Sequence, residues 1–228
     1  MSDQIILAAN GVNRIFQVGK TQVHALKDIN VNVKTGTLTM LRGRSGSGKT
    51  TLMNILGALD MPTSGNVFLH DKDITKLSEG KRDMLRRREI GFVFQSVALI
   101  SNMSAYENVE FGLRIAGISD KERKARAEEC LRLVGLGKRM THRPHEMSGG
   151  EQQRVAIARA IAHKPSVIFA DEPTAELDTT MGLQVLSLFR QLTEEEKLTI
   201  VMTTHDPNMM ELADHVYTLE DGEIIDER

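Results

Sequence analysis

The sequence is poor in cysteine and in long apolar runs, and each shortage excludes a class of protein. Its 228 residues include one cysteine, Cys130, so an intrachain disulfide and a paired-cysteine metal site are impossible. This usage fits a reducing, cytosolic setting. No stretch reaches the roughly 18 apolar residues of a membrane-spanning helix, and no basic segment followed by an apolar run opens the chain. We therefore expect neither a secretory signal nor a membrane span, so any membrane role must come through a partner.

A dominant charge of either sign is also lacking. The 29 Lys and Arg residues nearly balance the 31 Asp and Glu residues, which leaves a net charge of −2. Such a chain has no whole-molecule attraction to nucleic acid or to an anionic membrane. With 40% hydrophobic and 26% charged residues, the composition is that of an ordinary globular protein. The length predicts one large domain, or one domain that carries an inserted lobe.

The hydrophobic pattern alternates between strand and helix periods. Alternation or continuous apolar runs predict strands at 29–33, 37–41, 66–70, 167–170 and 198–204, and a final hairpin that turns at Asp221-Gly222. Helices are expected from Lys49 until Pro62-Thr-Ser-Gly65, over 120–136 with an apolar stripe through Cys130, from 149 until before Pro165, and around 183–192. Three Ser-x-x-Glu pairs have capping-box spacing, namely Ser104 with Glu107, Ser119 with Glu122, and Ser148 with Glu151. We infer a doubly wound α/β core with a helical insertion of roughly Ser96 to Met147.

A phosphate-binding loop follows the strand at 37–41. The residues Gly43, Arg44, Ser45, Gly46, Ser47, Gly48, Lys49 and Thr50 fit the pattern of a glycine, four residues and Gly-Lys-Ser/Thr. Glycines let successive N–H groups turn toward an anion, and the helix that follows adds a favourable potential. Lys49 can then reach the β- and γ-phosphates of a nucleotide, and the Thr50 hydroxyl can bind Mg²⁺. The alternative is a glycine-rich turn with a solvated lysine, but the predicted strand before the loop and helix after it favour nucleotide binding.

Two acids, Asp171 and Glu172, end the buried strand at 167–170. Ligands of open α/β sheets bind beyond the carboxyl ends of the strands, so Asp171 is placed to hold Mg²⁺ and Glu172 to act as general base on a water. His205 ends the next apolar strand and could contact the γ-phosphate or orient the water. Alone, an Asp-Glu pair is usually a loop start, and such a histidine is usually structural.

A second glycine-rich turn, Ser148-Gly149-Gly150-Glu151, begins a helix. It is either a good helix cap and nothing more, or a second anion site. The N-termini of two helices in one chain cannot easily reach a single γ-phosphate. Two chains in opposite orientation could enclose it between them.

Taken in order, these motifs resemble the ATP-binding subunit of an ABC transporter over nearly the whole chain. Gly43 to Thr50, with the adjoining Thr51, is similar to the Walker A loop, and Ser148 to Glu151 to the family signature. The resemblance implies a Q-loop role for Gln95, which would also approach Mg²⁺, a Walker B role for Asp171 and a catalytic role for Glu172. It further implies that Phe16 stacks on adenine, that Asp178 is the D-loop aspartate and that His205 is the switch histidine.

The family fold implied is a P-loop NTPase core with an N-terminal antiparallel β subdomain and an inserted α-helical subdomain. On this basis residues 1–228 form a single ATP-binding domain, with the core at 1–95 and 161–228 and the helical subdomain at about 96–160. The segments 91–95, 153–160 and 171–174 resemble the branch of macrolide exporters, lipoprotein-release transporters and peptide-resistance transporters. The chain departs from the usual pattern at Glu151, where Gln is common, at Met147 for Leu, at Phe16 for Tyr, and in the D-loop sequence at 175–178.

The resemblance implies an ATPase that binds ATP and Mg²⁺, forms a head-to-tail dimer with a second copy of itself, and drives separate integral membrane permease subunits. It would lie in the cytoplasm, peripheral on the inner face of the cell membrane, and serve export or extraction of a lipoprotein, peptide or drug. The alternatives are a soluble ABC ATPase that acts on nucleic acid or ribosomes, and a non-hydrolysing nucleotide sensor. No nucleic-acid partner is expected, because Asp83 and Glu89 interrupt the basic run at 81–88 and a solvated helix face explains it.

Overall fold

The computed structural model describes residues 4–204 and 211–228, which form two compact units. The first unit holds both ends of the chain, up to Arg86 and again from Leu192, and the second comprises Arg87–Gln191. None of the helices in the described ranges combines the length and apolar character needed to cross a bilayer. The division into a core and a helical subdomain at about 96–160 stays a prediction.

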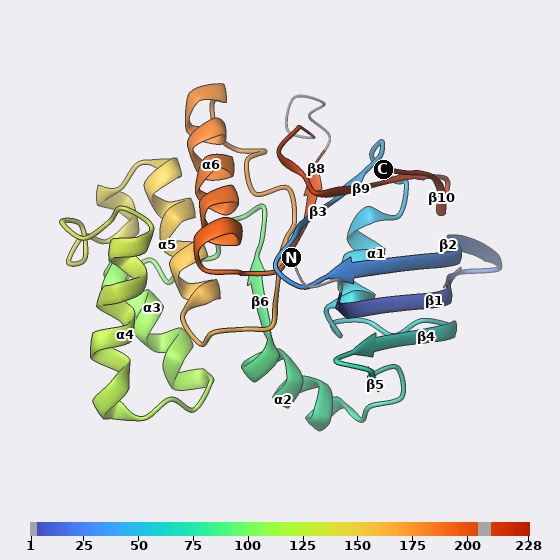
Figure 1. Ribbon diagram of the computed structural model, residues 1–228, viewed down its shortest axis with the longest axis horizontal. Coiled ribbons are helices and arrows are strands. Elements are labelled where there is room, and N and C mark those ends of the chain that lie inside the picture. The colour runs from blue at the N-terminus through green and yellow to red at the C-terminus, as the bar shows by residue number, and fades with distance from the viewer. Residues whose placement is uncertain (1–3, 205–210) are drawn as a thin grey trace. The chain divides into compact units, whose positions relative to one another are not determined.

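The first unit contains an antiparallel sheet and part of a mainly parallel one. The antiparallel sheet has the strand order β2-β1-β4-β5, and these strands lie side by side in Figure 1. They are β1 (Ile5–Val18), β2 (Thr21–Lys34), β4 (Ser64–Leu69) and β5 (Lys72–Asp73). The other strands have the order β10-β9-β3-β8. They are β3 (Leu38–Arg42), β8 (Ile200–Thr204), β9 (His215–Glu220) and β10 (Glu223–Glu227).

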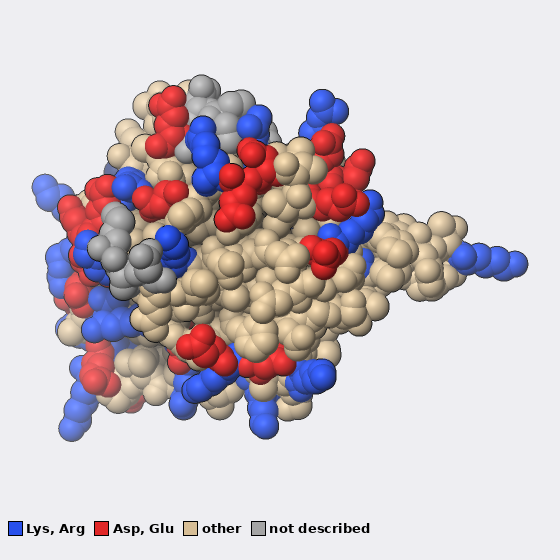
Figure 2. All heavy atoms as spheres, turned by 45° about the vertical axis from the view of Figure 1, so that its right-hand side comes forward, with Lys and Arg blue, Asp and Glu red and all other residues tan. Residues whose placement is uncertain are grey.

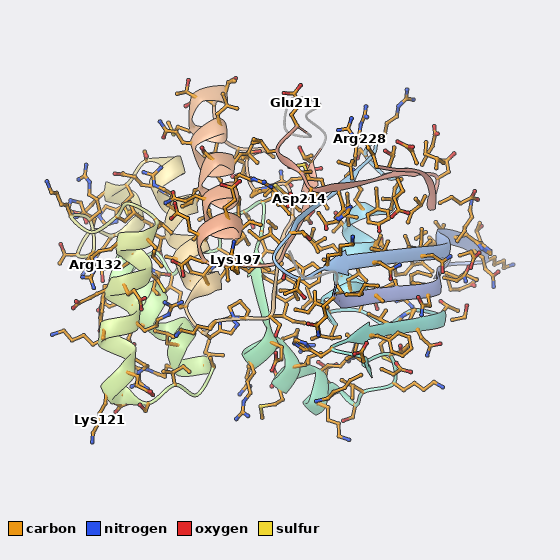
Figure 3. The ribbon with its side chains drawn as sticks, in the orientation of Figure 1. Lys121, Arg132, Lys197, Glu211, Asp214 and Arg228 are labelled. Atoms are coloured by element: carbon orange, nitrogen blue, oxygen red, sulfur yellow. The ribbon has the colours of Figure 1, made fainter. Side chains whose placement is uncertain are left out.

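Strand β3 lies at the centre of this arrangement, because it pairs in parallel with both β8 and β9. Asp214 fixes the register at the start of β9. Its carboxylate accepts a hydrogen bond from the Leu38 N–H at 2.8 Å, and its own N–H donates to the Leu38 carbonyl at 2.8 Å (Figure 3). The hairpin of β9 and β10 turns at Asp221-Gly222 as predicted, with positive φ at both residues. The strand that carries the glycine-rich loop is thus held on both sides.

Helix α1 (Lys49–Leu56) begins where the sequence predicts and ends earlier. Its last turn is closed by Gly57, whose N–H donates to the Met53 carbonyl at 2.8 Å. The predicted end near Pro62 to Gly65 is therefore wrong, since Ser64 and Gly65 already belong to β4. The chain leaves the helix at Ala58, whose φ of 56° is left-handed, and the Leu59 N–H donates back to the Asn54 carbonyl at 2.8 Å.

The second unit consists of two parallel strands and a layer of helices. Strands β6 (Ile90–Val93) and β7 (Val167–Ala170) pair in parallel, and every residue of β7 is buried, as its continuous apolar run predicts. The helices α3, α4 and α5 pack against one another (Figure 1). They are α3 (Ala105–Ile115), α4 (Asp120–Leu133) and α5 (Gly149–Ile161), with a short 3₁₀ turn η1 (Pro144–Glu146) before α5. Helices α2 (Glu79–Glu89) and α6 (Thr179–Glu195) carry the chain between the units.

Two of the three predicted capping boxes form, one at Ser104 and one at Ser148. At α4 the helix begins at Asp120 as predicted, but the Ser119 hydroxyl makes no bond to the helix backbone. It donates instead to the Glu122 carboxylate at 2.6 Å, so the expected box there is wrong. The predicted apolar stripe of α4 is confirmed, since Cys130 and Leu131 are fully buried.

Arginine side chains tie the helices of the second unit together. Arg126 of α4 donates to two carbonyl oxygens at the end of α5, with Nε 2.9 Å from that of Ala162 and Nη2 3.0 Å from that of Ile161. These are carbonyls that a helix terminus otherwise leaves without partners. The last turn of α5 is thereby fixed to its neighbour.

The basic run of α2 is a solvated helix face. None of the helix's residues is buried, and Arg82 and Arg86 both pair with Glu79, the latter at 2.9 Å. In Figure 2, acidic and basic side chains lie next to one another around the edges of the face that it presents, and a broad area at its centre carries few charges.

Candidate functional site

The phosphate-binding loop connects β3 to α1 and holds its own lysine. Lys49 is 6% exposed, and its Nζ donates to the carbonyl oxygens of Gly43 at 2.8 Å and Arg44 at 3.0 Å. These two bonds arch the loop around the ammonium group. Because an ammonium carries three hydrogens, one remains to be donated to a phosphate oxygen.

Gly48 lies at the point where the loop becomes a helix, and no other residue fits there. Its φ of 104° and ψ of −1° are left-handed, and an added Cβ would lie 2.7 Å from the Ala25 carbonyl oxygen. Gly48, the N-cap residue, has no side chain that could accept from the first N–H groups of α1. An anion is the natural partner of such a helix start.

The residues of the loop fit the phosphates of a nucleoside triphosphate that is bound with Mg²⁺. The Ser47 hydroxyl is buried and has no hydrogen-bond partner among the described residues. The hydroxyl belongs to the same loop as the Lys49 ammonium group, and both groups carry hydrogens that phosphate oxygens can accept. Thr50 of the first unit carries a hydroxyl and Asp171 of the second a carboxylate, and each is a hard oxygen group of the kind that Mg²⁺ prefers as a ligand.

Phe16, in β1, is the aromatic residue expected to stack on adenine, and an arginine covers one of its faces. The Arg14 guanidinium carbon lies 4.4 Å from the centre of the Phe16 ring, within cation–π range. The guanidinium is anchored in turn by Asp60, whose carboxylate is 2.9 Å from Nη2. Arg14 and Asp60 together hold one face of the ring in place.

In the second unit, the carboxyl ends of β6 and β7 bring three predicted residues to one edge. Val93 and Ala170 are partners in the register, and the Asp171 N–H donates to the Val93 carbonyl at 2.9 Å. Gln95 follows β6 by two residues, and Asp171 and Glu172 follow β7 directly. This is the edge of a parallel sheet where ligands bind.

Glu172 has a left-handed backbone, with φ of 42°, although it is not a glycine. Such a conformation costs of the order of 1–3 kcal/mol and persists only where the surrounding structure imposes it. The residue that follows is Pro173, which restricts its backbone further. A strained backbone at the predicted general base is consistent with a carboxylate whose direction matters for chemistry.

The signature turn begins α5 with a reciprocal cap. The Ser148 hydroxyl oxygen accepts from the Glu151 N–H at 3.2 Å, and the Glu151 carboxylate accepts from the Ser148 N–H at 2.9 Å. The bond from the Ser148 backbone, with help from Arg139 and Arg154, lowers the pKa of Glu151 below its usual range despite some burial. Because Ser148 uses its oxygen in the cap, the hydroxyl hydrogen can still be donated to an anion. Ser148 and Gly149 are exposed.

The D-loop packs directly against this turn. Asp178 caps α6, since its carboxylate accepts from the Met181 N–H at 2.9 Å. A Cβ added to Gly150 would lie 2.9 Å from the Met181 sulfur, and one added to Gly149 would lie 3.4 Å from the Leu177 side chain. The two glycines therefore allow the signature turn and the D-loop to approach closely.

Sequence reasoning missed Arg159, which links α5 to the segment after Gln95. Its guanidinium donates from Nη1 to the Ala98 carbonyl at 2.7 Å and from Nη2 to the Val97 carbonyl at 3.2 Å. Burial lowers the pKa of the guanidinium. The signal was present, because Arg159 is the only charged residue in the run Val-Ala-Ile-Ala-Arg-Ala-Ile-Ala at 155–162.

The structure thus groups the predicted residues within each unit. Phe16 and the loop that runs from Gly43 to Thr51 belong to the first unit. Gln95, the carboxylates, the signature turn and the D-loop belong to the second. His205 lies outside the described residues.

Comparison with known proteins identifies the family. A model of the ABC transporter family matches residues 26–175. The chain belongs to the ABC transporter family. Its relatives include an uncharacterised ABC transporter ATP-binding protein of Thermotoga maritima, 46% identical over 92% of this chain and 90% of that protein. The YvrO protein of Bacillus subtilis, an uncharacterised ABC transporter ATP-binding protein, is 45% identical over 98% and 97%. The macrolide export ATP-binding/permease protein MacB of Syntrophobacter fumaroxidans is 44% identical over 96% of this chain, which spans 31% of its length.

Among solved structures, this ABC cassette is similar to the ATP-binding cassette MJ0796, described as a dimer in a post-hydrolysis state bound to ADP and Pi. The two share 40% identity over 97% of each chain, with a TM-score of 0.88. The predicted ABC ATPase fold is therefore confirmed. The protein is an ATP-hydrolysing subunit of an ABC transporter and works with ATP and Mg²⁺.

Proposed function

We propose that two copies of this cassette bind two MgATP head to tail and drive a separate membrane permease for export or extraction. The observation that carries the dimer is the relative MJ0796, a dimeric cassette 40% identical over 97% of both chains. The export branch is supported by the MacB proteins, which unite an ATP-binding part like this chain with a permease. The cargo class follows the same likeness and comprises a lipoprotein, peptide or drug.

In this proposal each ATP contacts residues of both copies. One copy supplies Phe16 to the adenine, the loop from Gly43 to Thr51 to the phosphates, and Gln95, Asp171, Glu172 and His205 to the Mg²⁺ ion and the attacking water. The other copy supplies Ser148, Gly149, Gly150 and Glu151 of the signature, with Asp178 beside them. The γ-phosphate favours the closed dimer because it is the contact that the open state lacks.

The permease would hold the cassette at the inner face of the membrane. Within the second unit, a hollow of about 700 Å³ lies beside the start of α3 and offers a place for a cytoplasmic segment of the permease. Tyr106, Met140 and Thr141 line it, with Lys124 and Glu128 of α4. Two backbone bonds, from Ala105 to the His142 carbonyl and from Tyr106 to the Met140 carbonyl, connect its walls to the segment that leads to the signature. A force that the permease exerts on this hollow would be transmitted through these bonds to the segment that leads to the signature turn.

The dimer is tested with Glu172→Gln, which keeps the size of the side chain and removes the base. We expect this variant to bind MgATP, to lose about 10²–10⁴-fold in turnover, and to elute as a dimer in size-exclusion chromatography with MgATP. Ser148→Arg is the matching test of the second copy's role, because it fills the exposed turn while leaving the phosphate loop intact. It should bind ATP without turnover. A Glu172→Gln protein that stays monomeric at micromolar concentration with MgATP, or a Ser148→Arg protein with normal turnover, would refute the shared site.

A further inference from the structure

Glu151 adds a negative charge to the signature turn, where the proposed function brings a second negative charge, the partner's γ-phosphate. Two contacts within the same chain fix the position of this carboxylate. One oxygen accepts from the Ser148 N–H at 2.9 Å, and the other lies 3.2 Å from Nε of Arg139. The side chain of Glu151 is 18% exposed, whereas that of Arg139 is 47% exposed, so the carboxylate is largely covered while the guanidinium still meets water.

Arg139 reaches this position from the segment between α4 and α5. Its Nη1 lies 3.0 Å from Nε2 of His142, and its N–H donates to the Leu136 carbonyl at 2.9 Å. The same segment supplies the carbonyl oxygens of Met140 and His142 to the start of α3. Hydrogen bonds therefore hold in place the loop that brings Arg139 to the signature turn.

We propose that Arg139 is a positioning residue for ATP binding at the dimer face, which neutralises Glu151 so that the signature turn accepts the partner's γ-phosphate. The inference rests on the proposed head-to-tail dimer. An ion pair on an open surface contributes little, because water screens both charges. When a second copy covers the turn, water leaves and an unneutralised carboxylate near a phosphate repels it more strongly.

The same arrangement explains how the chain tolerates Glu where Gln is usual. A Glu or a Gln at this position can complete the cap with Ser148. With Glu, the charge must be balanced by a neighbour, and Arg139 is the group that contacts it directly; Arg154, one turn along the helix, adds a weaker attraction. The arginine acts through Glu151 and needs no contact with ATP.

A double-mutant cycle tests this proposal, because the proposal predicts in which direction each substitution changes the KM for ATP. We expect Arg139→Ala to raise the KM for ATP about three- to tenfold with a smaller change in kcat, and to weaken the MgATP-dependent dimer of the Glu172→Gln protein by a similar factor. Glu151→Gln alone should lower the KM, because it removes the negative charge that faces the γ-phosphate while Gln can still complete the cap. The double variant Arg139→Ala/Glu151→Gln should return the KM to the wild-type value, because no charge is left to neutralise.

The matched control is Arg132→Ala, which removes the same charge from α4 of the same unit. Arg132 projects away from the helices (Figure 3), its side chain is 58% exposed, and it pairs with Glu128 at 3.5 Å. Its loss should leave the KM as it is. If Arg139 merely braced its loop, Glu151→Gln would not rescue Arg139→Ala, and that result overturns the proposal. An unchanged KM in Arg139→Ala, beside a normal dimer of Glu172→Gln, would also overturn it while leaving the proposed function intact.

Discussion

Arg159 donates a hydrogen bond to the Ala98 carbonyl at 2.7 Å and so joins the signature helix to the segment that follows Gln95. Ala98 has a left-handed backbone, with φ of 47°, which turns its carbonyl toward the arginine. Beneath the guanidinium, α3 approaches so closely that a Cβ on Gly112 would lie 3.0 Å from Arg159 Cγ. The Arg159 side chain therefore contacts α3 and the segment that follows Gln95, and connects both to α5.

We expect Arg159→Met to destabilise the protein by about 2–4 kcal/mol, because two carbonyl oxygens lose a charged donor inside the unit. Urea unfolding followed by circular dichroism measures the change. Arg132→Met is the control, since the same substitution at an exposed position should shift the free energy of unfolding by less than about 0.5 kcal/mol. Equal effects of the two substitutions would show that Arg159 does not brace the helices.

Lys49→Ala should weaken ATP binding about ten- to a hundredfold, because a charge-assisted contact contributes roughly 1.5–3 kcal/mol. Isothermal titration calorimetry on the purified chain measures the affinity. Lys121→Ala removes the same charge from an exposed position at the start of α4 (Figure 3) and should leave the affinity unchanged. Wild-type affinity in Lys49→Ala would contradict the assignment of the phosphate loop.

Phe16→Ala should weaken ATP binding by about 1–3 kcal/mol, the usual contribution of a base stacked on an aromatic ring. Phe16→Tyr should bind as the wild type does, because the ring is kept. Arg14→Gln should have a smaller effect, roughly 0.5–1 kcal/mol, since the cation–π contact supports the ring from its other face. Titration with a fluorescent ATP analogue ranks the three variants, and equal affinity of Phe16→Ala and the wild type would remove the stacking role.

Acid should destabilise the protein partly through His163. Burial lowers the pKa of this histidine below its usual 6.5, although its ring contacts the Ile90 carbonyl at 3.1 Å. The unfolded chain therefore binds a proton more readily than the folded one, so this contribution is present above about pH 6.5 and is lost as the pH falls toward the folded-state pKa. His163→Gln keeps an N–H for Ile90 and should flatten the decline in unfolding free energy between about pH 7 and 5. Identical pH profiles for the two proteins would contradict this role.

The local patterns of the sequence predict local structure well. The loop from Gly43 to Thr50 lies between a strand and a helix as expected, and the cap of Ser148 and Glu151 forms because both partners lie within one helical turn. Where a local prediction is wrong, a neighbouring residue takes the role that the sequence pattern assigned to another. Helix α1 ends at the left-handed Ala58, before Pro62 is reached, and the Ser119 hydroxyl donates to the Glu122 carboxylate instead of capping the helix.

Contacts between distant segments are what the sequence does not disclose. Arg159 and Ala98 are 61 positions apart, and no periodicity connects them. The pairing of Arg139 with Glu151 likewise depends on the path of the intervening loop. Such contacts follow from how whole helices pack, so they become visible only in three dimensions.

Helix α5 is fastened at both ends, by its cap and Arg139 at Ser148 and by Arg126 at Ile161 and Ala162. Thirteen helical residues at about 1.5 Å each make a rod of roughly 20 Å that cannot easily bend or fray. Because Arg159 joins α5 to the backbone at Ala98, we expect a displacement of that backbone to move α5 as one rigid body, together with the signature turn at its first residue.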